Sequence, residues 1–264
     1  MIYCLFTMNC EFHSVIKDAV LSKHISLKLN KCRVVLFDLE FYVPEKSRVK
    51  TGLCYNPWDK SCKLLGGSFF VANPIKDFNL NDDGVMKKIE SFWLWDFKDE
   101  RELIVKIYEL LKEALSTVHN AHQKKVSPLL CGIGISSSDV PVLIELFKRY
   151  HLLSNAEAFR FQSNFRVIDL SQLAIACFNN SNDYLYPKVK NDLLTKYIPG
   201  LKFESGKGVW DLYESKKYTE IMNRVTSEII STHTVYKCIL SDYRNFKTLE
   251  KQDKKRVKLE SKVV

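Results

Sequence analysis

The sequence predicts an α/β fold, with a mixed five-stranded sheet flanked by helices, in a chain of 264 residues. Strand-like apolar runs dominate before residue 100, and helix-like and strand-like segments alternate after it. An antiparallel meander followed by helix, strand, helix and strand produces such a sheet. We divide the chain into an N-terminal extension (1–32) of uncertain structure, a central domain (33–243) and a basic C-terminal tail (244–264).

The strand predicted at residues 33–42 is the element around which we expect the sheet to form. Its apolar run, rich in β-branched and aromatic residues, is typical of a strand buried on both faces. The run leads into Asp38 and Glu40, which leave the same face of a strand about 7 Å apart. Two buried carboxylates so close together repel each other, and a divalent cation such as Mg²⁺ or Mn²⁺ relieves that repulsion. The alternative is an edge strand whose acids face water.

Further strands of the meander follow. A loop at 45–56 leads into a second strand, and residues 63–72 form a third, in which a Gly pair indicates a bulge or a close backbone approach. The alternating aromatic residues of 91–97 are either another strand or an aromatic plug. In the extension, residues 15–22 fit a short helix.

The second half of the central domain alternates between helix and strand. Apolar residues recur with helical period between Glu100 and Ala121, so we expect a long amphipathic helix there. The remaining predicted elements, in order, are a buried strand at 128–135, a helix at 139–150, a strand at 165–170, a helix at 171–178 and a long helix at 216–243.

Composition indicates where the protein works. The eight cysteines include no C-x-x-C pair and lie mostly in apolar runs, which favours reduced thiols in a cytoplasmic, reducing compartment. No window has the roughly 18 uninterrupted apolar residues of a membrane helix, so we expect no membrane partner. Met1 to Cys10 is interpreted as a strand or packing segment rather than a signal peptide.

The formal charge of +9 is spread widely along the chain and is denser in the tail. Residues 247–264 carry seven basic and three acidic side chains, which fits a solvated helix extension, a disordered tail or a segment that binds a polyanion. The run Lys254 to Lys258 also resembles a nuclear address, so a nuclear location is a second possibility.

A second informative stretch runs from Cys131 to Leu143. Here a buried strand ends in Gly and Ser residues, and Asp139 stands at the start of the next helix. Ser138 or Asp139 fits the cap of that helix, with Pro141 in its first turn. In the functional interpretation, the small residues let a nucleic-acid backbone approach and Asp139 supplies a third carboxylate.

These stretches resemble the motifs of an enzyme family. Phe-Asp38-Leu-Glu40, followed by Ser-Asp139-Val-Pro-Val-Leu, resembles the first and second motifs of the DEDD 3′–5′ exonucleases. Residues 208–213 and the helix at 221–236 resemble the third motif of the branch related to family B polymerase proofreading exonucleases. The resemblance covers about residues 33 to 240.

The resemblance implies a ribonuclease-H-like fold for the central domain, which is then an exonuclease-like domain. It also implies that Asp38, Glu40, Asp139 and Glu228 hold two divalent ions, Mg²⁺ or Mn²⁺. With these ions bound, the protein would hydrolyse terminal phosphodiester bonds of DNA or RNA at single-stranded 3′ ends. Asp169 ends a predicted strand, and we interpret it as a strand-end or helix-cap acid rather than a ligand.

The third motif is degenerate. The family's Asp falls on Glu228, which is longer by one methylene, and the family's catalytic Tyr falls on Arg224; a shift of one residue gives Asn223. Neither Arg nor Asn is a general base. We interpret Lys217 as a contact to the nucleic acid, and Arg224 either as a phosphate contact or as a surface arginine on a long helix. The alternative is a catalytically inactive exonuclease-fold protein that serves as a nucleic-acid-binding or adaptor module.

Overall fold

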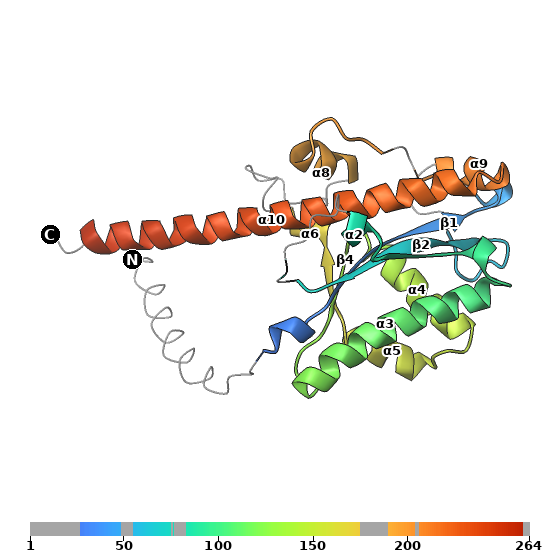
Figure 1. Ribbon diagram of the computed structural model, residues 1–264, viewed down its shortest axis with the longest axis horizontal. Helices are drawn as coiled ribbons and strands as arrows, with labels where there is room; N and C mark the ends of the chain where they lie inside the picture. The colour runs from blue at the N-terminus through green and yellow to red at the C-terminus, as the bar shows by residue number, and fades with distance from the viewer. Residues whose placement is uncertain are drawn as a thin grey trace, which may run out of the picture.

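The computed structural model describes residues 27–48, 55–74, 76, 83–174, 190–203 and 206–260. Its centre is a five-stranded mixed sheet in the order β3-β2-β1-β4-β5 (Figure 1). The strands are β1 (Val34–Tyr42), β2 (Lys63–Ala72), β3 (Ile89–Trp93), β4 (Leu129–Gly132) and β5 (Arg166–Asp169). β1 pairs antiparallel with β2 and parallel with β4, so it is the middle strand. The predicted α/β class is confirmed, and the alternative of an edge strand is wrong.

β1 is buried on both faces, and the two faces contact different layers. Val35, Phe37 and Leu39 pack into a core shared with the helices that follow β3. Val34 and Leu36 pack into a second core, shared with the C-terminal helix. Because side chains alternate along a strand, Asp38 and Glu40 follow Val34 and Leu36 onto the face of the C-terminal helix.

One face of the sheet is covered by α3 (Glu100–His122), α4 (Asp139–Arg149) and α5 (Asn155–Ser163) (Figure 1). Asp99 caps the start of α3 by accepting a hydrogen bond from the Glu102 amide at 2.9 Å, and Gln123, whose φ of 52° is left-handed, is the C-cap residue. Its buried residues share one stripe, as predicted: Leu103, Ile104, Ile107, Leu110, Leu111, Ala114, Val118 and His122.

The opposite face is covered by α6 (Leu170–Leu173), α8 (Lys190–Tyr197), α9 (Gly208–Glu214) and α10 (Tyr218–Glu260) (Figure 1). α10 packs Ile229, Val235 and Ile239 against the second core. The short elements are α2 (Asp83–Met86) and the 3₁₀ turns Leu29–Lys31, Glu45–Ser47 and Leu94–Asp96. The sheet is therefore enclosed between two helical layers.

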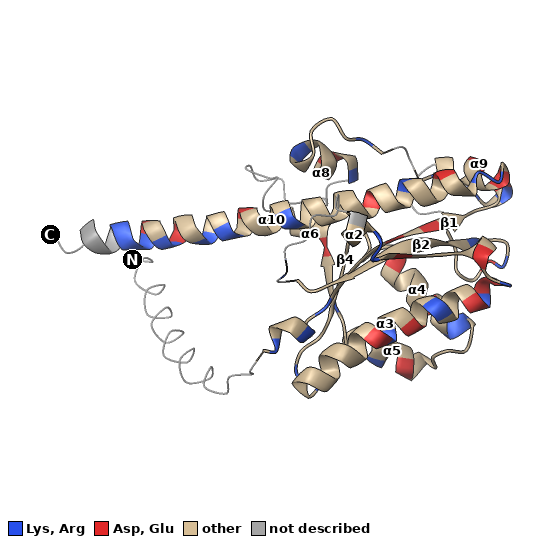
Figure 2. Ribbon diagram, viewed as in Figure 1, with Lys and Arg blue, Asp and Glu red and all other residues tan. Residues whose placement is uncertain are grey.

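α10 is longer than predicted, because it runs to Glu260 rather than ending near residue 243. Beyond residue 243 it projects past the sheet, with Lys and Arg along its length (Figures 1 and 2). Phe246 is 54% exposed and Leu249 is 57% exposed there. Of the alternatives for the tail, the helix extension is the one observed as far as residue 260. Among the described residues, no helix has both the length and the apolar content needed to cross a membrane.

The second strand expected after the loop at 45–56 was a wrong prediction. Residues 55–62 form turns, in which Asp59 accepts from the Ser61 amide at 2.8 Å. The meander is completed instead by β3, and Trp95, just beyond it, stacks on Trp93 and Tyr218. The helix expected at 171–178 is described only as α6, and the helix expected at 15–22 lies outside the described residues.

The Gly pair in β2 produces both predicted features. The pairing register between β1 and β2 shifts between Glu40 and Phe41, opposite Gly66, so the strand is bulged there. Gly66 has a φ of +132°, and a Cβ placed on it would lie 2.1 Å from the Phe92 carbonyl oxygen. A Cβ on Gly67 would lie 2.4 Å from the Asp38 carbonyl oxygen. The backbone around the two acids of β1 therefore depends on glycine in β2.

We predict that Gly66→Ala destabilises the fold by about 3 kcal/mol, because it adds a backbone clash to a left-handed conformation. For a domain of this size that loss lowers the melting temperature by roughly 6–12 °C. Thermal unfolding measured by circular dichroism tests this. Gly206→Ala is the control, since a Cβ there meets no described atom within 4 Å and should leave the melting temperature nearly unchanged. Equal melting temperatures for the two variants would contradict the prediction.

Candidate metal centre

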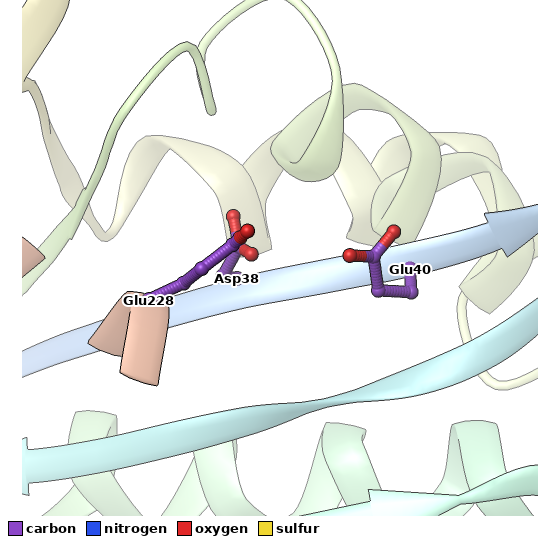
Figure 3. A group of neighbouring side chains, drawn as sticks. All are labelled: Asp38, Glu40 and Glu228. Carbon is purple, nitrogen blue, oxygen red and sulfur yellow. The ribbon is translucent and has the colours of Figure 1, made fainter. Parts of the chain in front are cut away.

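Three carboxylates converge on the α10 face of the sheet: Asp38 and Glu40 from β1, and Glu228 from α10. One oxygen from each lies within 4.8 Å of the others. In Figure 3 the Glu228 side chain extends from its helix to Asp38, and Glu40 follows on the same strand. The Glu228 side chain is 1% exposed and that of Asp38 is 16% exposed. Three of the four predicted ligands are thus brought together.

The packing of β1, α9 and α10 fixes these positions. Val225 and Ile229, on either side of Glu228 in α10, are both fully buried. Trp210 of α9 donates from Nε1 to the Phe41 carbonyl oxygen at 3.0 Å, which ties the segment before α10 to the end of β1. Residues that are far apart along the chain are therefore held in fixed positions around the carboxylates.

Asp139 lies next to this group but has partners of its own. Its Oδ1 accepts from the Leu39 amide at 3.0 Å, between the two acids of β1, and its Oδ2 accepts from the Ser138 hydroxyl. Ser138 is the N-cap residue of α4, and no hydrogen bond from its side chain to the helix cap is seen in this described segment. Asp139 therefore links the start of α4 to β1 and adds a fourth buried carboxylate at the edge of the cluster.

The donor set suits a divalent cation that prefers oxygen. Metal–oxygen distances of about 2.0–2.6 Å place the ligand oxygens of one ion within about 4–5 Å of one another. The carboxylate oxygens of Asp38, Glu40 and Glu228, which lie within 4.8 Å of one another, fit that spacing. The buried triad could hold a metal ion, with its oxygens contributed by a rigid strand and a rigid helix.

Two cationic side chains reach the same carboxylates. Lys190, at the start of α8, contacts Oε2 of Glu228 with its Nζ and lies 3.6 Å from Oδ2 of Asp38. The Nε of Arg224 lies 3.1 Å from Oε1 of Glu228 and 3.6 Å from Oε1 of Glu40. Reasoning from the sequence missed Lys190, because no motif connects the start of α8 with the acids. Only the presence of uncompensated buried charge could have suggested that a cation was needed.

Burial dominates the protonation of the cluster. Burial and the charge of Glu228 raise the pKa of Glu40 to about 8, although Arg224 opposes the shift. Burial also raises the pKa of Asp38 well above its usual range, with Lys190 opposing and Glu228 and Asp139 adding to the shift. Burial likewise raises the pKa of Glu228, but hydrogen bonds and the charges of Lys190 and Arg224 outweigh it, so the pKa of Glu228 is lowered. The acids of β1 therefore bind protons more tightly than usual, and the acid of α10 binds its proton less tightly.

The other predicted residues have different surroundings. Lys217 is exposed and forms an ion pair with Glu220 at 3.1 Å, at the start of α10. Asn223 is exposed and does not belong to the cluster. Of the two candidates for the Tyr position, it is Arg224 that reaches the carboxylates.

Asp169 ends β5 and caps α6, as predicted. Its carboxylate accepts from the amides of Ser171, Gly134 and Ser136 at 2.9–3.0 Å, and from the hydroxyls of Ser136 and Ser171 at 2.6 Å. Burial raises its pKa, but these hydrogen bonds outweigh burial and hold the pKa below its usual range. Asp169 therefore fixes the loop that leads to Asp139.

We predict that the metal-free protein loses stability as the pH rises from 6 toward 8, and that Glu40→Gln reduces this loss. Glu40 binds its proton more tightly in the folded chain, with a pKa of about 8, than in the unfolded chain, with a pKa near 4.5. The stability that this proton contributes is therefore complete below the pKa of the unfolded chain. It disappears as the pH rises past the pKa of the folded chain.

The measurement is the melting temperature in chelator across this pH range. Loss of one proton corresponds to roughly 3–5 °C per pH unit for a domain of this size. Glu113→Gln, an exposed change on α3, is the control and should follow the parent. Parallel curves for the parent and Glu40→Gln would show that Glu40 is ionised throughout.

Comparisons with known proteins do not assign this centre to a family. A scan against protein-family models found no match, and a search of curated proteins found no similar chain. Among the described residues, the centre consists of a buried carboxylate triad, a fourth acid beside it, and two cations.

Proposed function

We propose that this protein is a metal-dependent 3′–5′ exonuclease, with a ribonuclease-H-like fold, that hydrolyses phosphodiester bonds of DNA or RNA. The observation that carries the proposal is the convergence of Asp38, Glu40 and Glu228 within 4.8 Å. Such a cluster is costly to bury, because desolvation and the repulsion among its charges oppose the packing of α10 on β1. A catalytic role for the cluster would explain why the chain contains it despite this cost.

The arrangement of the sheet supports the same proposal. Two antiparallel pairings on one side of β1 and two parallel pairings on the other are the order that a ribonuclease-H-like fold requires. The positions of the acids support it as well: two are on the central strand, Asp139 follows β4, and Glu228 is on the last helix.

In the proposed reaction, one or two Mg²⁺ or Mn²⁺ ions would activate water and stabilise the leaving oxygen. Asp38, Glu40 and Glu228 would hold the ions, and Asp139 would complete the shell beside Asp38. The rigid strand and helix fix the carboxylates in advance, so little reorganisation accompanies the reaction. Arg224 lies among these acids, where its guanidinium would meet a phosphate that reached the ions.

The loop before α4 supports access by a nucleic-acid strand. Gly134 has a φ of +78°, and a Cβ placed there would meet no described atom within 4 Å. The loop is nevertheless held firmly, because Asp169 accepts from the Gly134 and Ser136 amides. A fixed and uncrowded backbone beside Asp139 suits a single-stranded 3′ end.

We predict metal-dependent shortening of 5′-labelled single strands of DNA or RNA, lost in Asp38→Asn by a factor of about 100 or more. Removing groups that only support metal ligands typically costs 10–100-fold, so losing a ligand should cost at least as much. Product ladders in Mg²⁺, Mn²⁺ and chelator are the measurement. Glu113→Gln should retain full activity. If Asp38→Asn degrades the strands as fast as the parent, the proposal is wrong.

A second candidate is a catalytically inactive module of the same fold that binds nucleic acid. Lys190 and Arg224 favour it, since they already neutralise much of the charge of Asp38, Glu40 and Glu228. Binding of labelled strands that is unaffected by chelator, without any shortening, would identify this function.

The degenerate third motif gives a further prediction. Arg224→Tyr together with Glu228→Asp restores the Tyr and Asp of the resembled branch and removes a guanidinium from the cluster. Groups that orient or activate water contribute about 10²–10⁴-fold, so cleavage should rise clearly above that of the parent. Rates of shortening for the parent, each single variant and the double variant measure the effect. Slower cleavage by the double variant would show that Arg224 serves the reaction itself.

A further inference from the structure

The Lys190 ammonium lies where it contacts two of the three candidate metal ligands. Its Nζ contacts Oε2 of Glu228 and lies 3.6 Å from Oδ2 of Asp38, and Glu40 adds a further attractive charge. The side chain of Lys190 is 29% exposed, and its ammonium lies 5.6 Å from the centre of the Phe203 ring. The cluster therefore has an internal cation that bridges β1 and α10.

A metal ion bound to these oxygens would lie close to this ammonium. With metal–oxygen distances of about 2.0–2.6 Å, an ion on Oδ2 of Asp38 would be at most about 6 Å from Nζ of Lys190. A divalent ion and an ammonium at that separation repel each other strongly in a partly buried site. Both cations also require the same carboxylate oxygens.

We propose that Lys190 is the resident counter-ion of this centre and that a divalent metal ion loads by displacing its ammonium from Asp38 and Glu228. This inference rests on the metal site of the proposed function and adds a means of regulating it. Before a metal arrives, Lys190 offsets part of the negative charge of Asp38 and Glu228, which favours folding of the metal-free chain. Metal affinity is then set by competition with a side chain of the protein.

The contacts of α8 allow the Lys190 side chain to move while the helix stays in place. Leu193 and Leu194 are fully buried in the second core. Asn191 exchanges two hydrogen bonds with the backbone of Phe203, at 3.0 and 3.1 Å. These contacts anchor α8 independently of the cluster, so displacement requires only rotation of the long Lys190 side chain toward solvent.

The first test measures Mn²⁺ binding by titration calorimetry for the parent, Lys190→Gln and Lys190→Arg. We expect Lys190→Gln to bind Mn²⁺ about tenfold more tightly or better, since one competing charge is gone. Its melting temperature in chelator should fall, and its rise on adding Mn²⁺ should exceed that of the parent. Lys190→Arg should stay near the parent, and Lys196→Gln, on the exposed side of α8, is the control.

The second test uses the unchanged protein and so does not depend on a variant that folds. Brief labelling with an amine-reactive reagent, read by peptide mass spectrometry, should modify Lys190 several-fold faster after Mn²⁺ is added. The labelling of Lys196 should not change. Unchanged or slower labelling of Lys190 at saturating Mn²⁺ would overturn the proposal, as would equal or weaker Mn²⁺ binding by Lys190→Gln.

The outcomes separate this inference from the proposed function. Tighter Mn²⁺ binding by Lys190→Gln with no cleavage of nucleic acid upholds the exchange and refutes the exonuclease. Cleavage by the parent, together with an unchanged Mn²⁺ affinity in Lys190→Gln, upholds the exonuclease and refutes the exchange. If neither protein binds Mn²⁺ or Mg²⁺, both are refuted.

Discussion

Negative charge buried beside the central strand is the constraint to which the rest of this structure responds. Asp38, Glu40, Asp139 and Glu228 come from three separate elements and are all largely or wholly withdrawn from solvent. Their repulsion and desolvation would oppose folding without compensation. The structure compensates in several ways: Lys190 and Arg224 pair with the acids, the Leu39 amide and Ser138 bond to Asp139, and protons are held more tightly.

The parts of the fold that follow from local patterns could be predicted from the sequence. The continuous apolar run of β1 indicated a strand buried on both faces, and the period of α3 defined its buried stripe to within one or two residues. The Gly pair of β2 indicated a bulge before any partner strand was known. Each of these signals lies within a single element, so tertiary context did not override it.

The errors have different causes. Residues 55–62 form turns because of a local signal, since Asn56, Pro57 and Asp59 favour turns and Asp59 accepts from the Ser61 amide two residues on. α10 continues far beyond the last residue that packs on the sheet, so the end of its apolar stripe did not mark the end of the helix. Of the site, the strand spacing could place Asp38 and Glu40 on one face, whereas their approach to Glu228 depended on a resemblance. Lys190 could not be found, because a lysine at the start of a short helix carries no local signal of its partner.

The unbroken course of α10 limits where the chain can change in length. Each residue turns the direction of a helical side chain by about 100°, so adding or removing one residue between Glu228 and the buried Val235 would point the carboxylate away from β1. A change of about seven residues, close to two whole turns, nearly restores the angle, but it shifts Glu228 by about 10 Å along the axis. In the exposed segment after Tyr243, adding or removing residues would not turn Glu228 away from β1. Within this one helix, the half that carries Glu228 is fixed in length and the other half is not.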